Sequence, residues 1–143
     1  MIKCREVMTQ DPVCCLASDR VATVAELMRA HDIGAVPVVN DPTMKQLIGI
    51  VTDRDLALRV VSQGRDIETT TVAHVMTPNP WASSASDDVE DVLRIMAQHQ
   101  VRRVPITVED GQLVGIIAQA DVATRLHNPP TTAAVIAEIS QPA

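Results

Sequence analysis

Apolar residues recur along the first half of this chain at spacings that predict a helix between several strands. One helix face is marked by apolar residues at the i, i+3, i+4 and i+7 positions, namely Val21, Val24, Ala25 and Met28. Ser18 and Asp19 precede this face and are candidate N-caps. We therefore expect a helix that begins there and ends near His31.

Continuous apolar runs in the same half predict strands. The short run 13–15 precedes the helix, and Ala35–Val39 follows it. The turn-forming residues 40–42 end that run, and Leu47–Thr52 predicts a further strand. A second helix is expected over 53–61, because Asp53 stands at its start.

The second half of the chain repeats this order of elements. It predicts a helix near 87–99, strands at 103–108 and Leu113–Ala118, a turn at Glu109–Gly111, and a helix that continues to about His127.

The two halves also match residue by residue, which identifies an internal repeat. The triplet Val-Met-Thr at 7–9 returns 68 residues later at 75–77. After a two-residue deletion, Asp55 returns 66 residues later as Asp121. Two related copies are expected to pack with pseudo-twofold symmetry, and their interface then offers two equivalent clefts. We predict an α+β fold of tandem motifs, each with the order β-α-β-β-α.

The repeat divides the chain into four parts. We expect a first motif with an N-terminal lead over 1–62, a polar linker over 63–74 and a second motif over 75–127. The remaining residues, 128–143, form a tail in which 132–140 is expected to be a short helix with an apolar stripe.

Composition narrows the classes of function. A formal net charge of -6 argues against general nucleic-acid binding, which needs a basic face. No apolar run approaches the roughly 18 residues of a membrane span, and residues 1–6 lack a signal-peptide core. We therefore expect a cytoplasmic protein that binds neither nucleic acid nor a membrane.

The reactive residues do not form a recognisable catalytic or metal-binding pattern. Cys4, Cys14 and Cys15 cannot build a full disulfide framework, and we expect them to be small buried apolar residues. There is no Cys-x-x-Cys motif, and the histidines are scattered, so no metal site is expected. Without a nucleophile–base pair or a glycine-rich phosphate loop, the protein is not expected to be an enzyme.

The segment 49–55 carries the first candidate binding motif. It is an apolar strand that ends in Gly-x-x-Thr-x-x-Asp at the start of a helix. A carboxylate at such a corner can accept both hydroxyls of a ribose, and a hydroxyl and free helix N–H groups can face a phosphate. Simple helix capping by Thr52 or Asp53 is the alternative interpretation.

Two adjacent arginines form the second candidate. Arg102 and Arg103 stand just before a buried strand. A guanidinium fork matches the oxygens of a phosphate, so the pair is a candidate phosphate clamp. A solvated surface pair is the alternative interpretation.

Three motifs in combination, at 31–39, 49–56 and 99–106, resemble the CBS domain, a small regulatory module found in tandem pairs. The resemblance covers about 5–127 and is closest to short stand-alone bacterial CBS-pair proteins. It implies an adenosyl ligand such as AMP, ADP, ATP, NAD or S-adenosylmethionine, bound in the clefts between the copies. It implies that the protein has no catalytic activity and requires no cofactor. It also implies that ligand binding acts in trans on an effector protein whose identity is unknown.

The resemblance also implies which residues line each cleft. The main cleft would combine ribose and phosphate contacts with an adenine wall, through Thr52, Asp55, Arg102, Arg103, Ile50, Val51, Pro80, Trp81 and Ala82. Trp81 is the only tryptophan, and the chain has no phenylalanine or tyrosine. The alternative interpretation of Trp81 is a residue of the core or of a dimer contact.

A second, weaker cleft would use Val13, Cys14, Arg54, Ala118 and Asp121. Gly34 and Ala35 stand there in place of the two arginines, so most phosphate contacts would be lost.

We also expect a homodimer, because the helices carry apolar residues that one core cannot cover, namely Leu27, Leu56, Leu58, Ile95 and Leu126. The alternative function is a dimerisation or protein-interaction module that needs no ligand.

Overall fold

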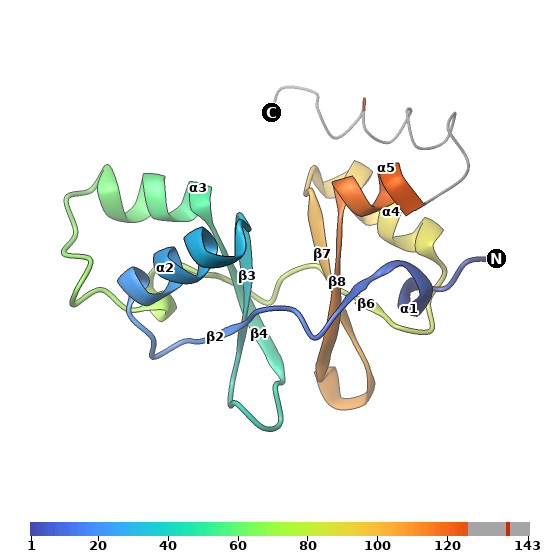
Figure 1. Cartoon of the computed structure of the whole chain (residues 1–143), viewed down its shortest axis with the longest axis horizontal. Helices are drawn as coiled ribbons and strands as arrows, with labels where there is room; N and C mark the ends of the chain where they lie inside the picture. Colours follow the sequence, from blue (N-terminus) through green and yellow to red (C-terminus); the bar gives the residue numbers. More distant parts are fainter. Residues whose placement is uncertain (126–136, 138–143) are drawn as a thin grey trace. The chain divides into compact units, whose positions relative to one another are not determined.

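The computed structural model describes residues 1–125 and residue 137 (Figure 1). The chain forms two compact units. One is the continuous segment Pro12–Pro80, which we call the central unit. The other, which we call the terminal unit, combines Met1–Asp11 with the chain from Trp81 onward. The first eleven residues therefore fold with the second repeat.

The central unit is built on a four-stranded sheet with the order β2-β3-β4-β5. Its strands are β2 (Cys15–Leu16), β3 (Ala35–Val39), β4 (Leu47–Thr52) and β5 (Thr77–Pro78). The helical elements are α2 (Val21–His31), α3 (Asp53–Leu56), the π-helix η1 (Ala57–Val61) and the 3-10 helix η2 (Val72–His74). β2 is parallel to β3, and the other pairs are antiparallel.

The terminal unit has the same plan, with the sheet order β1-β8-β7-β6. Its strands are β1 (Thr9–Gln10), β6 (Ser83–Ser84), β7 (Arg103–Thr107) and β8 (Leu113–Ala118). Its helical elements are α1 (Cys4–Val7), α4 (Val89–His99), the 3-10 helix η3 (Glu109–Gly111) and α5 (Gln119–Arg125). The mixed α+β class that the sequence predicts is therefore confirmed.

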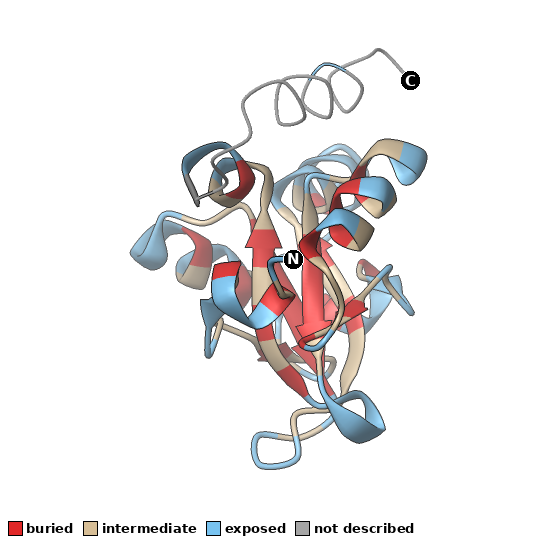
Figure 2. Ribbon diagram, turned by 90° about the vertical axis from the view of Figure 1, so that its right-hand side faces the viewer, coloured by how far each residue is buried: buried red, intermediate tan, exposed pale blue. Residues whose placement is uncertain are grey.

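Each unit has its own aliphatic core between its sheet and helices. In the central unit all five residues of β3 are buried, and Val24 on α2 and Val51 on β4 are fully buried against them. In the terminal unit Met96 on α4 and Ile117 on β8 have the same role. Figure 2 shows the buried residues concentrated on the strands and on the inner faces of the helices.

Each Val-Met-Thr triplet adds a strand to the sheet of the other repeat. β1 pairs with β8 through Thr9 and Ile116, and β5 pairs with β4 through Thr77 and Ile50. The backbone of a glycine lies close to the methionine of each triplet: a Cβ on Gly49 would lie 2.6 Å from the Met76 sulfur, and a Cβ on Gly115 would collide with the Met8 side chain. This close packing explains why both features recur together in the sequence.

Several predicted elements are confirmed, and others need correction at their ends. The strands Ala35–Val39, Leu47–Thr52 and Leu113–Ala118 agree with the structure, as do the helix ends at His31 and His99. The strand expected at 103–108 ends at Thr107. The helix expected near 87–99 begins at Val89, with Asp88 as its N-cap.

The prediction for the start of the chain was wrong in two respects. The strand expected at 13–15 is Cys15–Leu16, because these two residues pair with β3. The N-cap of α2 is Arg20, not Ser18 or Asp19, because the Asp19 carboxylate accepts the Leu16 N–H at 2.9 Å instead.

Two predictions concern the end of the chain. Helix α5 is described to Arg125, so the expected end near His127 lies outside the described residues. The same holds for the helix expected at 132–140, apart from residue 137. Among the described residues no helix is long and apolar enough to cross a membrane.

Candidate functional site

Thr52 and Asp55 form a reciprocal cap where β4 passes into α3. The Asp55 N–H donates to Thr52 Oγ1 at 3.1 Å, and the Thr52 N–H donates to Asp55 Oδ2 at 2.9 Å. The Asp55 side chain is 14% exposed, and its Oδ1 lies 3.8 Å from Nε of Arg59. Thr52 therefore caps this helix, and the capped carboxylate keeps an edge at the surface. A ligand-binding role for the motif stays a prediction.

The terminal unit contains the equivalent corner between β8 and α5. There the Ala118 N–H donates to Asp121 Oδ2 at 2.9 Å. Alanine offers no hydroxyl to complete the reciprocal cap, as the sequence comparison of the two repeats indicates. Both repeats therefore hold one carboxylate in the same orientation at a strand-to-helix corner.

The two arginines lie at the start of β7, beside this second corner. Arg103 pairs with Ala118 across the sheet, and the Arg102 carbonyl accepts the Gln119 N–H at 2.8 Å. In the central unit Ala35 pairs with Thr52, and the Gly34 carbonyl accepts the Asp53 N–H at 2.9 Å. The predicted equivalence of Gly34 and Ala35 with Arg102 and Arg103 is therefore confirmed.

The two arginines differ in exposure. Arg102 is exposed and Arg103 is half-buried. Among the described residues, neither side chain makes a hydrogen bond or an ion pair. A guanidinium group that has no partner among the described residues is suited to an anion such as a phosphate.

Within each unit, the structure shows which candidate residues share a strand-to-helix corner. Arg102, Arg103 and Asp121 share one corner of the terminal unit. The assignment of Asp121 to the weaker cleft stays a prediction. Thr52 and Asp55 share a corner with Arg54, which is exposed. The pairing of Asp55 with the two arginines joins residues of different units and stays a prediction.

The residues predicted to surround adenine are unequal in exposure. Ile50, Pro80 and Ala82 are half-buried, whereas Val51 is fully buried in the core of the central unit. The Val51 side chain therefore cannot line a binding surface. Trp81 is 55% exposed, which excludes the core role considered for it.

One face of the Trp81 indole is covered by His99. The ring centroids are 3.7 Å apart and the planes differ by 10°, so the two rings are stacked. Sequence reasoning placed His99 correctly at the end of its helix but missed this contact. No residue pattern signals it, because the two side chains come from segments separated by a whole helix.

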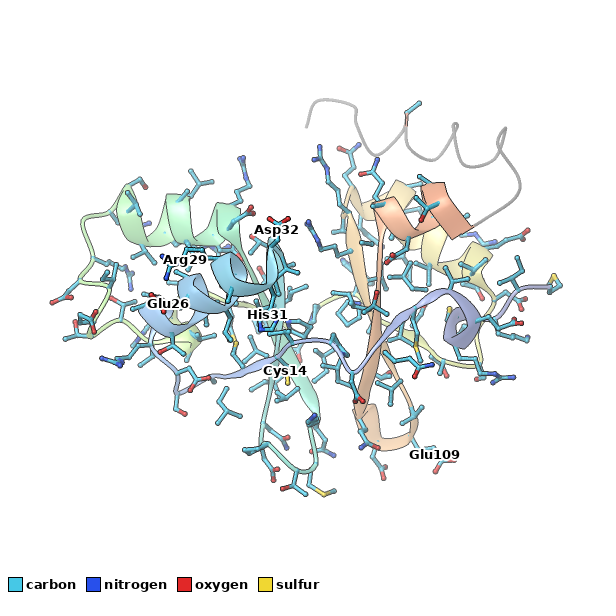
Figure 3. The ribbon with its side chains drawn as sticks, viewed as in Figure 1. Cys14, Glu26, Arg29, His31, Asp32 and Glu109 are labelled. Carbon is cyan, nitrogen blue, oxygen red and sulfur yellow. The ribbon has the colours of Figure 1, made fainter. Side chains whose placement is uncertain are left out.

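The residues predicted for the second cleft include two that precede β2. Val13 and Cys14 are half-buried, and Val13 occupies the repeat position of Trp81. Because Val13 has no ring, the aromatic stack of the terminal unit has no counterpart on His31. Figure 3 labels Cys14 together with His31 and Asp32, which lie where α2 ends.

The thiols of the two buried cysteines, Cys4 and Cys15, have raised pKa values, so both are protonated at neutral pH. Burial raises the pKa of the Cys4 thiol to about 11 and that of the Cys15 thiol to about 12. Neighbouring carboxylates add to both shifts. None of the three cysteines forms a disulfide. Within the described part of the chain, no group of three His, Cys, Asp or Glu side chains could hold a metal ion.

Arg59 is a further residue of the first corner that the sequence did not single out. Its Nη1 donates to the carbonyl of Val75 at 3.0 Å, while its Nε faces Asp55. The sequence feature that could have pointed to Arg59 is its match with Arg125 in the second repeat.

Comparison with known proteins gives a consistent family. The family model of the CBS domain matches residues 4–62 and 72–128. The CBS domain-containing protein YhcV of Bacillus subtilis is 36% identical over 140 residues, which cover 98% of this chain and 96% of that protein. Hypoxic response protein 1 of Mycobacterium tuberculosis is 33% identical over 126 residues, covering 88% and 86%.

Solved structures agree with this result. A crystal structure of hypoxic response protein I with two coordinated zinc ions has a TM-score of 0.78 and 34% identity, and the match covers 87% of this chain and 98% of that chain. The structure of CBSX2 in complex with AMP has a TM-score of 0.73 and 25% identity, covering 87% and 96%. With two matched CBS domains and relatives that share more than 30% identity over most of their length, the chain belongs to the CBS-domain family.

Proposed function

We propose that this CBS-domain pair is a regulatory module that binds an adenosyl ligand and carries out no catalysis. The observation that carries the proposal is the pair of guanidinium groups at Arg102 and Arg103, which lack partners among the described residues and stand beside a strand-to-helix corner. Support also comes from CBSX2, a relative of similar fold whose structure contains AMP.

Each part of an adenine nucleotide has a matching group in this proposal. A capped carboxylate accepts the two ribose hydroxyls, because its backbone hydrogen bond leaves acceptor capacity free. The arginines bind the phosphate through charge-assisted hydrogen bonds. The indole of Trp81 stacks on the adenine ring.

The proposed main site takes its ribose carboxylate from Asp55, and its phosphate contacts from Arg102 and Arg103. A second arrangement is favoured by one observation: Asp121 lies at the same corner as the two arginines. In that arrangement a single unit supplies both the ribose and the phosphate contacts. The two arrangements predict opposite effects of removing each carboxylate.

Calorimetry with AMP, ATP, NAD, S-adenosylmethionine and adenosine tests the function. Arg102→Ala and Arg103→Ala should each weaken AMP binding by about 10- to 100-fold, because a charge-assisted hydrogen bond contributes about 1.5–3 kcal/mol. Adenosine, which has no phosphate, should be affected much less. Equal losses for AMP and adenosine would exclude the phosphate role, and no binding of any of the five would exclude the function.

The carboxylates are compared in the same assay. Asp55→Asn should abolish most AMP binding, and Asp121→Asn should leave the main site close to wild type. The reverse result would move the site to the corner that contains the arginines.

In this proposal the module passes its ligand occupancy to a separate effector protein in the cytoplasm. Three cysteines without a disulfide suit that reducing compartment. A ligand-independent dimerisation module is the alternative function. It is favoured by Leu58 and Val61, which are 48% and 73% exposed on one helical element.

A further inference from the structure

The guanidinium group of Arg59 joins the Asp55 carboxylate to the backbone that leads into the terminal unit. Nη1 of Arg59 donates to the carbonyls of Val75 and Met76 at 3.0 and 3.4 Å. Its Nε lies 3.8 Å from Asp55 Oδ1. One side chain therefore contacts both a candidate ribose ligand and residues 75–80, which we call the connecting segment.

The connecting segment is held to the central unit by contacts of two kinds. The Met76 side chain packs against Gly49, and the Asn79 N–H donates to the Ile48 carbonyl at 3.1 Å. These contacts anchor the segment to β4. The Arg59 contacts are different in kind, because the same guanidinium group also faces a carboxylate that is proposed to bind ligand.

The local backbone around Arg59 is unusual. Arg59 lies in the π-helix Ala57–Val61, where the Ser62 N–H donates to the Ala57 carbonyl at 2.9 Å. Such five-residue turns are rare and are frequent at functional sites. The turn here begins two residues after Asp55, so the least regular part of the helix carries the arginine.

We propose that Arg59 is a positioning residue that transmits ligand occupancy at Asp55 to the connecting segment. This inference rests on the proposed function. A ribose hydroxyl that donates to Asp55 shares the carboxylate charge and weakens its attraction for Arg59. The guanidinium donors then turn further toward the carbonyls of Val75 and Met76. The segment ends at Pro80, after which the chain enters the terminal unit, so its stability reports the state of the site.

A ligand-free double-mutant cycle tests the coupling directly. Amide hydrogen exchange is measured by NMR at Met76, Thr77 and Asn79 in the wild type, Asp55→Asn, Arg59→Met and the double variant. Asp55→Asn alone should change these exchange rates by up to about fivefold, as expected for a partly exposed ion pair. In the Arg59→Met background the same substitution should change them no further.

The control for the cycle is Arg54→Met. Arg54 lies beside Asp55 on α3, but among the described residues its side chain makes no hydrogen bond or ion pair. Its effect should therefore add to that of Asp55→Asn. If Asp55→Asn has the same effect with and without Arg59, the proposal is overturned.

AMP provides the second arm of the experiment. Saturating AMP should change exchange in the connecting segment of the wild type, while Arg59→Met binds AMP without that change and Arg59→Lys restores part of it. An AMP effect that persists in Arg59→Met would contradict the inference. If the wild type binds none of the adenosyl ligands, the proposed function fails, and the ligand-free cycle still decides the role of Arg59.

Discussion

The indole ring of Trp81 is stacked on the imidazole ring of His99, with centroids 3.7 Å apart and planes 10° apart. Both residues belong to the terminal unit, where Trp81 is its first residue after the connecting segment and His99 ends α4. The stack restricts the rotamers of an exposed side chain that would otherwise be free. It therefore prepares one indole face for a second planar group, which in the proposed function is adenine.

His99→Ala should weaken AMP binding by up to about tenfold, because an aromatic pair contributes about 0.5–1.5 kcal/mol and its loss frees the indole to rotate. Since Trp81 is the only tryptophan, its fluorescence reports the stack even without ligand. The emission should change in His99→Ala and recover largely in His99→Phe, which keeps a planar ring. Unchanged emission in His99→Ala would show that the two rings do not stack in solution.

Asp55→Ala should lower the free energy of unfolding by about 0.5–2 kcal/mol, because it removes one half of the reciprocal cap with Thr52. Urea denaturation provides the measurement. Asp55→Asn keeps an acceptor for the Thr52 N–H and should lose less, and Asp53→Ala at the exposed neighbour is the control. An Asp55→Ala variant as stable as the wild type would argue against the cap.

The sequence predicts the inner strands well because burial on both faces gives continuous apolar runs, as in Ala35–Val39. It could not predict that Thr9 pairs with Ile116, because a two-residue strand has no periodicity of its own. The candidate site divides in the same way. The corner residues Thr52 and Asp55 follow from local spacing, whereas the stack on Trp81 depends on a tertiary contact.

Gly49→Ala should destabilise the central unit by about 1–3 kcal/mol, because the added Cβ would overpack against Met76 and the Thr77 carbonyl. Thermal unfolding measures the loss. Met76→Ala removes the side-chain part of the clash, so the double variant should be more stable than the sum of the two single losses predicts. Strict additivity would show that Met76 does not contact this glycine.

Stability should fall as the pH rises above about 9, because burial raises the pKa of Cys15 to about 12 in the folded state. The unfolded thiol, with its ordinary pKa near 9, loses its proton first. The unfolded state then binds fewer protons, and the free energy of unfolding decreases by up to about 1.4 kcal/mol per pH unit for this group. Below that range the thiol is protonated in both states and contributes no slope.

Denaturation between pH 8 and 10.5 measures this slope in the wild type and in Cys15→Ala. The variant should be less sensitive to pH, although it is less stable at neutral pH because a buried group is lost. Equal slopes in the two proteins would mean that Cys15 is accessible to hydroxide in the folded state.

The expected homodimer now depends on a smaller apolar surface than the sequence indicated. Leu27 and Leu56 are packed against the core of the central unit, and Ile95 against that of the terminal unit. Leu126 lies outside the described residues. Of the five residues named from the sequence, Leu58 is therefore the one that the structure describes as exposed, with Val61 three residues beyond it.

We predict that Leu58→Ser combined with Val61→Ser weakens dimerisation tenfold or more, because burying one such side chain contributes about 1.5–3 kcal/mol. Light scattering over a range of concentrations under reducing conditions measures the dissociation constant. Met44→Ser is the matched control, since Met44 is 58% exposed but lies in the turn between β3 and β4. A wild-type mass near 15.4 kDa at micromolar concentration would exclude a stable dimer. A dimer that reductant abolishes would instead be explained by a disulfide between chains, and Leu58 and Val61 would then have no part in it.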